Sequence, residues 1–343
     1  MQDYRKLETL RDNQFKWLVT GAAGFIGSNI TEYLLLNNQI VIGVDNFETG
    51  SRDNLNQIQR IVSNKQWSNL KFFERDITNK DELVDIFDDI DFTLHQAALG
   101  SVPRSIENPA RTNDVNIGGF VNVMDQSIAA RVKAFIYASS SSVYGDHPSL
   151  PKIEGVIGNQ LSPYAVTKYS NELYAGVFSS IHGIKSIGLR YFNVFGKRQN
   201  PGGPYAAVVP LWISAILQNN EIFINGDGTT TRDFCYVKNA VQANILAALN
   251  HENCKQSDVF NIAFGQENSL NDLFCLIVDA LKNQGFKYTR DASYRDFRAG
   301  DIKSSLADIS RAKKFLGYCP EYDLRSGLAE LSKEILEEIS NNV

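Results

Sequence analysis

The sequence predicts an α/β fold, a doubly wound parallel sheet followed by a smaller C-terminal α/β lobe. Short apolar runs alternate with helix-length amphipathic segments through the first half of the chain. A glycine-rich loop at residues 21–27 separates the first strand from the first long helix. After about residue 193 the alternation stops and turn-forming sequences appear. Alternating strands and helices form right-handed βαβ units, which cover both faces of a parallel sheet.

The alternating segments place the elements in order. Strands are expected at 17–20, 40–44, 71–74, 93–96, 134–138 and 186–191. Helices are expected between them at 26–37, 80–87, 113–130 and 163–181. Further helices are expected at 208–218, 238–249, 270–283 and 325–340, after the turn signals at 201–204 and 225–228.

This pattern divides the chain of 343 residues into two units and an arm. Residues 1–14 form a short polar arm or helix, and residues 15–193 form the sheet domain. Residues 194–234 and 263–343 form the smaller lobe, while 235–262 return to the sheet.

Composition excludes several classes of protein. The net charge of −5 argues against a nucleic-acid partner. The four cysteines are scattered without a CxxC pair or a histidine at ligand spacing, so reduced thiols and no metal site are expected. The N-terminus lacks an apolar core and no run approaches ~18 apolar residues, which predicts a cytoplasmic protein without membrane contact.

The glycine loop predicts a dinucleotide site of the Rossmann type. Gly21 allows a tight turn, Gly24 lets the backbone approach a pyrophosphate, and Gly27 permits close packing of helix against strand. The helix N-terminus offers free N–H groups to the phosphates. Asp45 ends the second strand, where a carboxylate binds a ribose 2'-hydroxyl and repels a 2'-phosphate. The expected cofactor is therefore NAD.

A second constellation predicts acid/base chemistry. Tyr164 and Lys168 stand at i and i+4 on one helix face, behind Ser162-Pro163 as N-cap and first residue. A lysine charge there lowers the tyrosine pKa, so the phenol can act as a base. Four serines, 139–142, follow the strand at 134–138. Read alone, the pair could be surface decoration and the serines a polar loop.

Taken together, the spacing GxxGxxG, the serine run and YxxxK resemble the extended branch of the short-chain dehydrogenase/reductase family. The resemblance implies that Tyr164 is the acid/base, that Lys168 tunes it and anchors the ribose, and that Ser140 and Ser142 lie near the reacting oxygen. It also implies a set of cofactor contacts: Gly21, Gly24, Phe25, Ile26, Gly27, Asp45, Asn46, Gly50, Asp76, Ile77, Gln96, Ala97, Ala98, Tyr164 and Lys168.

The serine run discriminates among reactions in that family. Nucleotide-sugar dehydratases resemble one another in carrying Thr-Asp-Glu at the positions of Ser140, Ser141 and Ser142. Hydroxyls alone can support reversible oxidation at one carbon but not elimination. Reversible oxidation at one carbon is the reaction of an epimerase that regenerates a tightly held NAD. A 4,6-dehydratase, a net reductase and a catalytically silent NAD-binding protein are the alternatives.

From about residue 17 to residue 327 the chain resembles bacterial UDP-hexose 4-epimerases, particularly those acting on N-acetylated sugars. The smaller lobe is then a UDP-sugar-binding lobe. Ser305 stands where a small residue goes with acetamido sugars, although it could be an inconsequential loop serine. The implied substrate contacts are Ser101, Arg104, Ser140, Ser141, Ser142, Asn193, Ala207, Val208, Trp212, Phe223, Asn225, Arg232, Arg298, Asp301 and Ser305.

Three further expectations concern charges, a histidine and assembly. Arg232 and Arg298 suit a diphosphate, because guanidinium groups pair bidentately with anionic oxygens, but each could instead form a surface ion pair. His95 is expected to be a buried structural residue. Relatives use the helices at 113–130 and 163–181 as a dimer interface, so a homodimer is expected, with core packing as the alternative.

Overall fold

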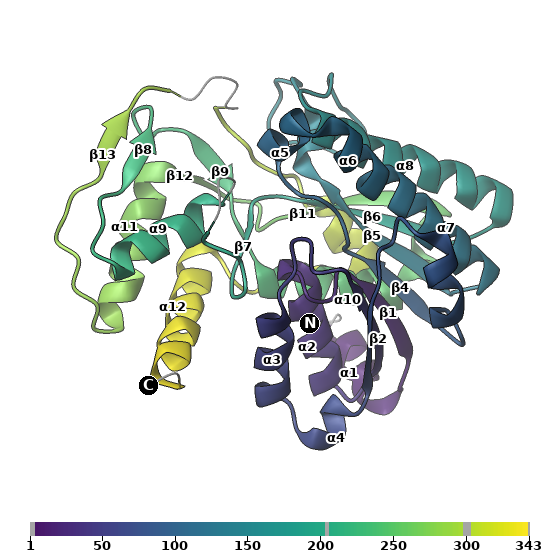
Figure 1. The fold of residues 1–343 in the computed structure, drawn as a ribbon. Coiled ribbons are helices and arrows are strands. Elements are labelled where there is room, and N and C mark those ends of the chain that lie inside the picture. Colours follow the sequence, from purple (N-terminus) through teal and green to yellow (C-terminus); the bar gives the residue numbers. More distant parts are fainter. Residues whose placement is uncertain (1–3, 203–205, 298–302, 342–343) are drawn as a thin grey trace.

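The centre of the molecule is a parallel sheet of seven strands, seen nearly edge-on in Figure 1, in a computed structural model that describes residues 4–202, 206–297 and 303–341. The strands run in the order β11-β6-β5-β4-β1-β2-β3. They are β1 (Lys16–Thr20), β2 (Ile40–Asp45), β3 (Leu70–Glu74), β4 (Phe92–His95), β5 (Ala134–Ser140), β6 (Ser186–Tyr191) and β11 (Ser257–Ile262). The expected doubly wound α/β sheet is therefore confirmed.

The order of the strands reverses beside β1, which is hydrogen-bonded to β2 on one side and to β4 on the other. The chain after β1 goes to β2 and β3 on one side, and the chain after β4 goes to β5 and β6 on the other side. The carboxyl ends of β1 and β4 therefore flank a crevice. Ligands of open α/β sheets bind in such a crevice.

Helices cover both faces of the sheet, and alternate residues of β1 show how. Trp17 and Val19 pack on one face with α2 (Phe25–Leu36), α3 (Arg52–Ile61) and α10 (Val237–Leu249). Leu18 packs on the other face with α7 (Phe120–Ala129) and α8 (Pro163–His182). The period of two along a strand thus divides the core into two layers.

The remaining helices of the sheet domain are short. They are α1 (Tyr4–Asp12), α4 (Asn64–Trp67), α5 (Val102–Glu107) and α6 (Pro109–Asn113), with 3₁₀ turns η1 (Lys80–Ile86) and η3 (Ser141–Tyr144). The arm expected at the N-terminus contains helix α1, whose Leu10 is buried in the core.

Two expected α-helices take other forms. The segment at 80–87 is the 3₁₀ turn η1, because its buried residues Leu83 and Ile86 are three apart and so fall on one face of that tighter helix. The helix expected at 113–130 begins with a π-helical turn, η2 (Asp114–Gly119), before α7. Two adjacent glycines weaken α-helix there, and a Cβ on Gly119 would lie 2.5 Å from Ile77 Cδ1.

The C-terminal lobe has its own core, on the left of Figure 1. Its elements are α9 (Val208–Leu217), β8 (Phe223–Asn225), β9 (Thr231–Asp233), β12 (Glu267–Ser269), α11 (Leu270–Asn283), β13 (Ser293–Arg295) and α12 (Leu324–Asn341). β8 pairs with β13 and β9 with β12, while β7 (Val194–Phe195) pairs with β10 (Cys235–Tyr236). Within the expected return segment, β11 joins the main sheet and α10 packs against it, whereas β10 is not a strand of that sheet. The turns η4 (His251–Asn253) and η5 (Ala312–Leu316) lie on either side of β11 in the chain.

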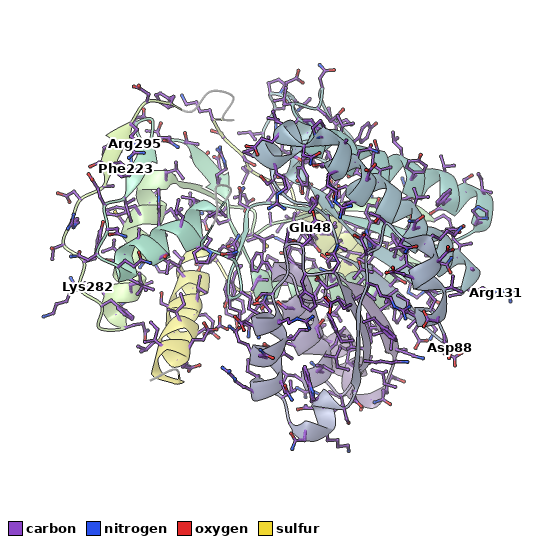
Figure 2. All side chains as sticks on the ribbon, viewed as in Figure 1. Glu48, Asp88, Arg131, Phe223, Lys282 and Arg295 are labelled. Carbon is purple, nitrogen blue, oxygen red and sulfur yellow. The ribbon has the colours of Figure 1, made fainter. Side chains whose placement is uncertain are left out.

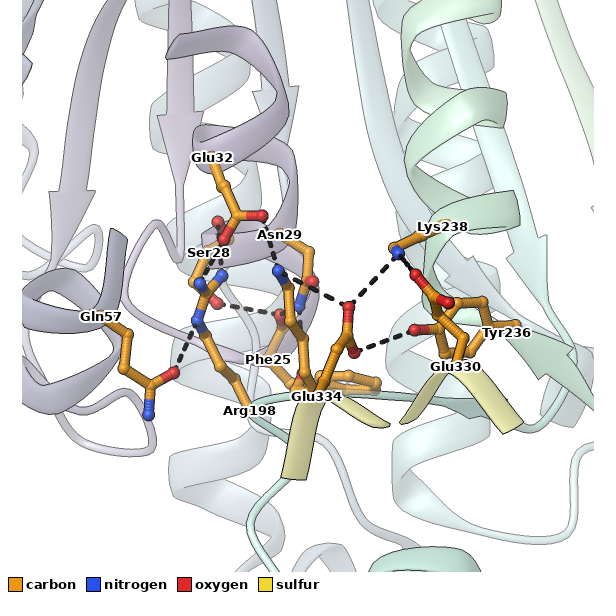
Figure 3. Close-up of polar contacts among 11 residues, drawn as sticks. Phe25, Ser28, Asn29, Glu32, Gln57, Arg198, Tyr236, Lys238, Glu330 and Glu334 are labelled. Carbon is orange, nitrogen blue, oxygen red and sulfur yellow. Dashed lines mark hydrogen bonds and ion pairs between the residues drawn. The ribbon is translucent and has the colours of Figure 1, made fainter. Parts of the chain in front are cut away.

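A chain of charges joins the two lobes (Figure 3). Glu32 on α2 pairs with Lys197 at 2.6 Å and with Arg198, whose side chain is completely buried. Burial would raise the pKa of Glu32, but the two cations hold it below its ordinary value. Lys197 also lies 3.9 Å from Glu334 on α12, which accepts a hydrogen bond from Tyr236. The helix behind the glycine loop is thereby linked to the C-terminal lobe.

Among the described residues, no helix has both the length and the apolar character that crossing a bilayer requires.

Candidate active site

A cavity of about 740 Å³ opens at the carboxyl edge of the sheet, where the switch in strand order predicts a ligand. Every residue that the sequence predicted to contact the cofactor lines it. Five of the predicted substrate contacts also line it, namely Ser101, Arg104, Ser140, Asn193 and Ala207.

The glycine loop forms the floor of this cavity. Gly21 has a φ of +70° and its N–H donates to Val44 O at 2.7 Å, which turns the chain sharply off β1. A Cβ on Gly27 would lie 2.0 Å from Gly21 O, so α2 packs directly on the loop. The first N–H groups of α2 therefore face the cavity, as binding a pyrophosphate requires.

Asp45 is a buried carboxylate at the end of β2. It accepts hydrogen bonds from Ala23 N at 3.0 Å and Phe47 N at 2.8 Å. Burial raises its pKa, and these backbone bonds oppose the rise. The loop of residues 46–50 folds back so closely that a Cβ on Gly50 would lie 2.9 Å from the carboxylate oxygens. A ribose hydroxyl fits beside this group, whereas a further phosphate would meet its negative charge.

Beyond Asp45, the cavity continues to three more of the predicted cofactor contacts, Asn46, Asp76 and Ile77. Asn46 Nδ2 donates to Asp76 Oδ2 at 3.0 Å, and Asp76 also accepts from Thr78. Ile77 is buried against Gly119 of η2. This end of the cavity therefore suits a flat apolar group, with the Asp76 carboxylate at its edge.

Tyr164 and Lys168 come from the first turns of α8 and line the opposite end of the cavity. Ser162 caps the helix by accepting from Ala165 N at 3.2 Å, and Pro163 follows at the first position. Lys168 Nζ donates to Ala138 O at 2.8 Å, and burial lowers the pKa of Lys168 to about 8.

The predicted lowering of the Tyr164 pKa is not seen. Burial raises the pKa of this phenol, and a hydrogen bond with Ser140 opposes the rise. Lys168 Nζ lies 6.0 Å from the centre of the tyrosine ring and is bound to the Ala138 carbonyl instead. Desolvation is therefore the dominant effect on the pKa of this phenol.

The serine run is divided between the cavity and the protein interior. Ser139 and Ser140 line the cavity, and Ser139 Oγ donates to Glu172 at 2.6 Å. Ser141 and Ser142 are not among the lining residues, and Ser142 Oγ is buried without a hydrogen-bond partner among the described residues. The turn η3 rotates these two serines away from the carboxyl edge, so the hydroxyls at the cavity are those of 139 and 140.

Several predicted substrate contacts lie in the C-terminal lobe and do not line the cavity. Trp212 is a core residue that packs against Phe274, because α9 turns its apolar side inward. The guanidinium carbon of Arg295 lies 3.2 Å from the centre of the Phe223 ring. Figure 2 shows both residues on the C-terminal lobe, remote from Glu48. Others away from the cavity are Val208, Asn225, Arg232 and Ser305. Arg298 and Asp301 lie outside the described residues.

The cavity also contains residues that the sequence did not single out. Tyr191 at the end of β6 donates to Gln96 Oε1 at 3.0 Å and accepts from Asn244 Nδ2 at 2.7 Å. Its position at a strand end was the available signal, the same one that indicated Asp45. Gln199 also lines the cavity, but it lies in a loop without periodicity.

His95 is structural, as expected. It is completely buried at the end of β4, 2.8 Å from Thr20 Oγ1. Burial lowers its pKa to about 3, so the ring is neutral at physiological pH.

Comparison with known proteins gives a consistent result. Residues 17–263 match the model of the "NAD dependent epimerase/dehydratase family". A putative UDP-glucose 4-epimerase of Methanocaldococcus jannaschii is 37% identical, over 95% of this chain and 98% of that protein.

Two solved structures have the same fold. A UDP-N-acetylglucosamine 4-epimerase from Methanobrevibacter ruminantium, in complex with UDP-N-acetylmuramic acid, has a TM-score of 0.86 and 38% identity, covering 95% of this chain and 99% of that one. A UDP-glucuronic acid 4-epimerase from Bacillus cereus, in complex with UDP-glucuronic acid and NAD, has a TM-score of 0.79 and 32% identity, covering 95% and 100%.

Proposed function

The chain belongs to the NAD-dependent epimerase/dehydratase family, and we propose that it inverts C4 of UDP-N-acetylhexosamines, interconverting UDP-GlcNAc and UDP-GalNAc through a 4-keto intermediate. It is a UDP-sugar 4-epimerase, and NAD is its cofactor. The N-acetylated sugars are our proposal within that activity, and UDP-glucose and UDP-galactose are further candidate substrates.

The residues of the cavity fit NAD. The first turn of α2 suits the pyrophosphate, Asp45 the ribose, and Tyr164 and Lys168 the nicotinamide end. When bound there, NAD would supply the hydride chemistry: reversible hydride exchange with C4 of the sugar, which permits return to the other face of the ketone.

The protein's own contribution is to hold and move a proton. Although burial raises the pKa of Tyr164, its phenolate form is the one that takes the proton of the 4-hydroxyl as that carbon is oxidised, and the resulting phenol returns the proton when the ketone is reduced. Ser140, hydrogen-bonded to the phenol, stabilises its anionic form. The ammonium of Lys168 adds positive charge at the same end of the cavity.

The observation that carries epimerisation over elimination is the position of the carboxylates. The acids among the described lining residues are Asp45, Glu48 and Asp76, all at the adenosine end. Beside Tyr164 the lining offers the hydroxyls of Ser139 and Ser140. Among the described lining residues, no carboxylate lies beside Tyr164 to remove a second proton from a neighbouring carbon, which disfavours the dehydratase alternative.

Ser305 is the basis for proposing an N-acetylated sugar. Its segment, residues 303–307, is fixed on two sides, since Lys303 O accepts from Thr231 N at 3.0 Å and Leu306 O accepts from Lys152 N at 2.8 Å. By the resemblance to UDP-hexose 4-epimerases, a small side chain at this position would leave room for an acetamido group, whereas a tyrosine would fill that room.

Assaying the purified enzyme separately with UDP-GlcNAc, UDP-GalNAc, UDP-Glc, UDP-Gal and UDP-glucuronate tests this proposal. We expect the highest kcat/KM on the acetamido pair and expect Ser305→Tyr to suppress that pair selectively. The matched control is Ser310→Tyr, an exposed serine a few residues away. Preference for glucuronate, or equal losses on all sugars in Ser305→Tyr, would contradict the proposal. Net consumption of added NADH, with a reduced sugar as product, would support a reductase instead.

We further propose that the enzyme is a homodimer formed through α8. Val166, Leu173, Val177 and Ile181 are half to two-thirds exposed and, at spacings of seven, four and four, share one face of that helix. Light scattering should give twice the chain mass, and Leu173→Glu should give monomers. Ile61→Glu, at an equally exposed residue on α3, is the control. A monomeric wild-type protein would exclude this interface.

A further inference from the structure

Three charged side chains meet at the adenosine end of the cavity. Arg111, on the short helix α6, lies with Nη2 2.5 Å from Glu48 Oε2 and 3.2 Å from Asp76 Oδ2. Glu48 belongs to the loop after β2, and Asp76 to the loop after β3. One guanidinium therefore joins three segments that are far apart in the sequence.

These segments surround the position expected for adenosine. Glu48 and Asp76 both line the cavity, and so does Val115, one helical turn after Arg111. Figure 2 shows Glu48 at the centre of the molecule, in front of the sheet. All three charged side chains are about one-third exposed, so the cluster lies at the rim rather than in the interior. The ion pairs thus join the cavity's walls at its opening.

We propose that Arg111 retains the cofactor, by holding the loops of residues 46–50 and 76–78 closed around the adenosine half of NAD. The Asn46–Asp76 hydrogen bond already joins these loops at their base. Arg111 adds the outer connection from a third element, α6. NAD must part these loops to leave, so the ion pairs slow its release. Because the cluster is partly exposed, thermal opening still allows exchange.

Charge attraction alone makes a different prediction, which gives the test. NAD carries a net negative charge at neutral pH, so attraction by Arg111 would be weakened in Arg111→Ala but strengthened in Glu48→Gln. Closure by the ion pairs requires both side chains, and both variants should then release NAD faster. Arg111→Ala makes the net charge more negative and Glu48→Gln makes it less negative. Charge attraction therefore predicts opposite changes in the rate of NAD release, whereas closure by the ion pairs predicts faster release from both variants.

The experiment measures the dissociation of radiolabelled NAD from the holoenzyme after a chase with excess unlabelled NAD. We expect roughly twofold to fivefold faster release from Glu48→Gln, and at least as large an increase from Arg111→Ala, which also removes the pair with Asp76. The double variant should release NAD as fast as Arg111→Ala, because that substitution already removes both pairs. Higher salt should accelerate release from wild type more than from Arg111→Ala.

Lys80→Ala is the matched control. Lys80 pairs with Asp125 of α7 at 2.6 Å, so it also connects the segment after β3 to the helical layer, but it does not line the cavity. Unchanged release in Arg111→Ala, or slower release in Glu48→Gln, would overturn the proposal. Thermal melting of each apo-protein distinguishes faster release from loss of folding.

Discussion

Replacing Gly27 by alanine tests whether close packing of α2 on the glycine loop creates the pyrophosphate site. The new methyl group would lie 2.0 Å from Gly21 O and 2.7 Å from Gly21 C, far inside the 3.0 Å that real Cβ contacts respect. The N-terminus of α2 must therefore move away from the loop by about 1 Å, since packed backbone cannot absorb the overlap.

Overpacking of this kind costs about 1–3 kcal/mol. If the shift displaces the N–H groups that bind the phosphates, NAD affinity falls by roughly fivefold to 150-fold. Isothermal titration of the apo-enzyme with NAD measures this, and thermal melting without NAD measures the strain borne by the fold. Gly155→Ala is the control, because no atom lies within 4 Å of a Cβ there. A Gly27→Ala enzyme that binds NAD within twofold of wild type would refute the packing argument.

Three other perturbations test the site and its surroundings. Tyr164→Phe removes the proton carrier, so turnover should fall by about 10²–10⁴-fold while the purified protein still contains NAD; near-normal turnover would exclude the base. Asp45→Ala should weaken NAD more than NADP, measured as the ratio of the two dissociation constants, and an unchanged ratio would remove the ribose argument. Because His95 has a folded-state pKa of about 3, below its unfolded value, the unfolded chain binds more protons between these values. The free energy of unfolding should therefore fall as pH drops from about 6.5 towards 3, by at most about 1.4 kcal/mol per pH unit. Urea titrations should show that the free energy of unfolding depends less steeply on pH in His95→Phe than in wild type. Equal pH dependence in the two proteins would assign the effect to other titratable groups.

All the residues predicted to contact the cofactor line one cavity, because many of them stand at strand ends. Gly21, Asp45, Asp76 and Gln96 each lie at or just after the end of a strand, and parallel strands bring their carboxyl ends to one edge. Local pattern is then enough to place a side chain in the cavity. Tyr191 obeys the same rule at the end of β6.

Fewer of the predicted substrate contacts line the cavity, because the C-terminal lobe has no comparable rule that places a side chain from local pattern. Trp212 lies in an amphipathic helix whose buried face depends on α11 and α12, elements that follow it in the sequence. Ser140 lines the cavity and Ser142 does not, because the 3₁₀ turn η3 begins between them and changes the direction of the side chains. The Arg111 pairs depend on the mutual approach of three loops. These are tertiary properties, invisible to spacing alone.

The return of β11 to the main sheet has a consequence for synthesis on the ribosome. β6 pairs along its whole length with β11, yet residues 192–256 come between them in the chain. Until residue 262 has emerged, one side of β6 is an unpaired edge, and the face covered by α10 is exposed. A nascent chain that stops after residue 193 would contain the glycine loop, Asp45 and Tyr164 but an incomplete sheet. The cofactor domain therefore cannot complete its sheet before the first part of the C-terminal lobe has been synthesised, and the two lobes are coupled in folding before they are coupled in catalysis.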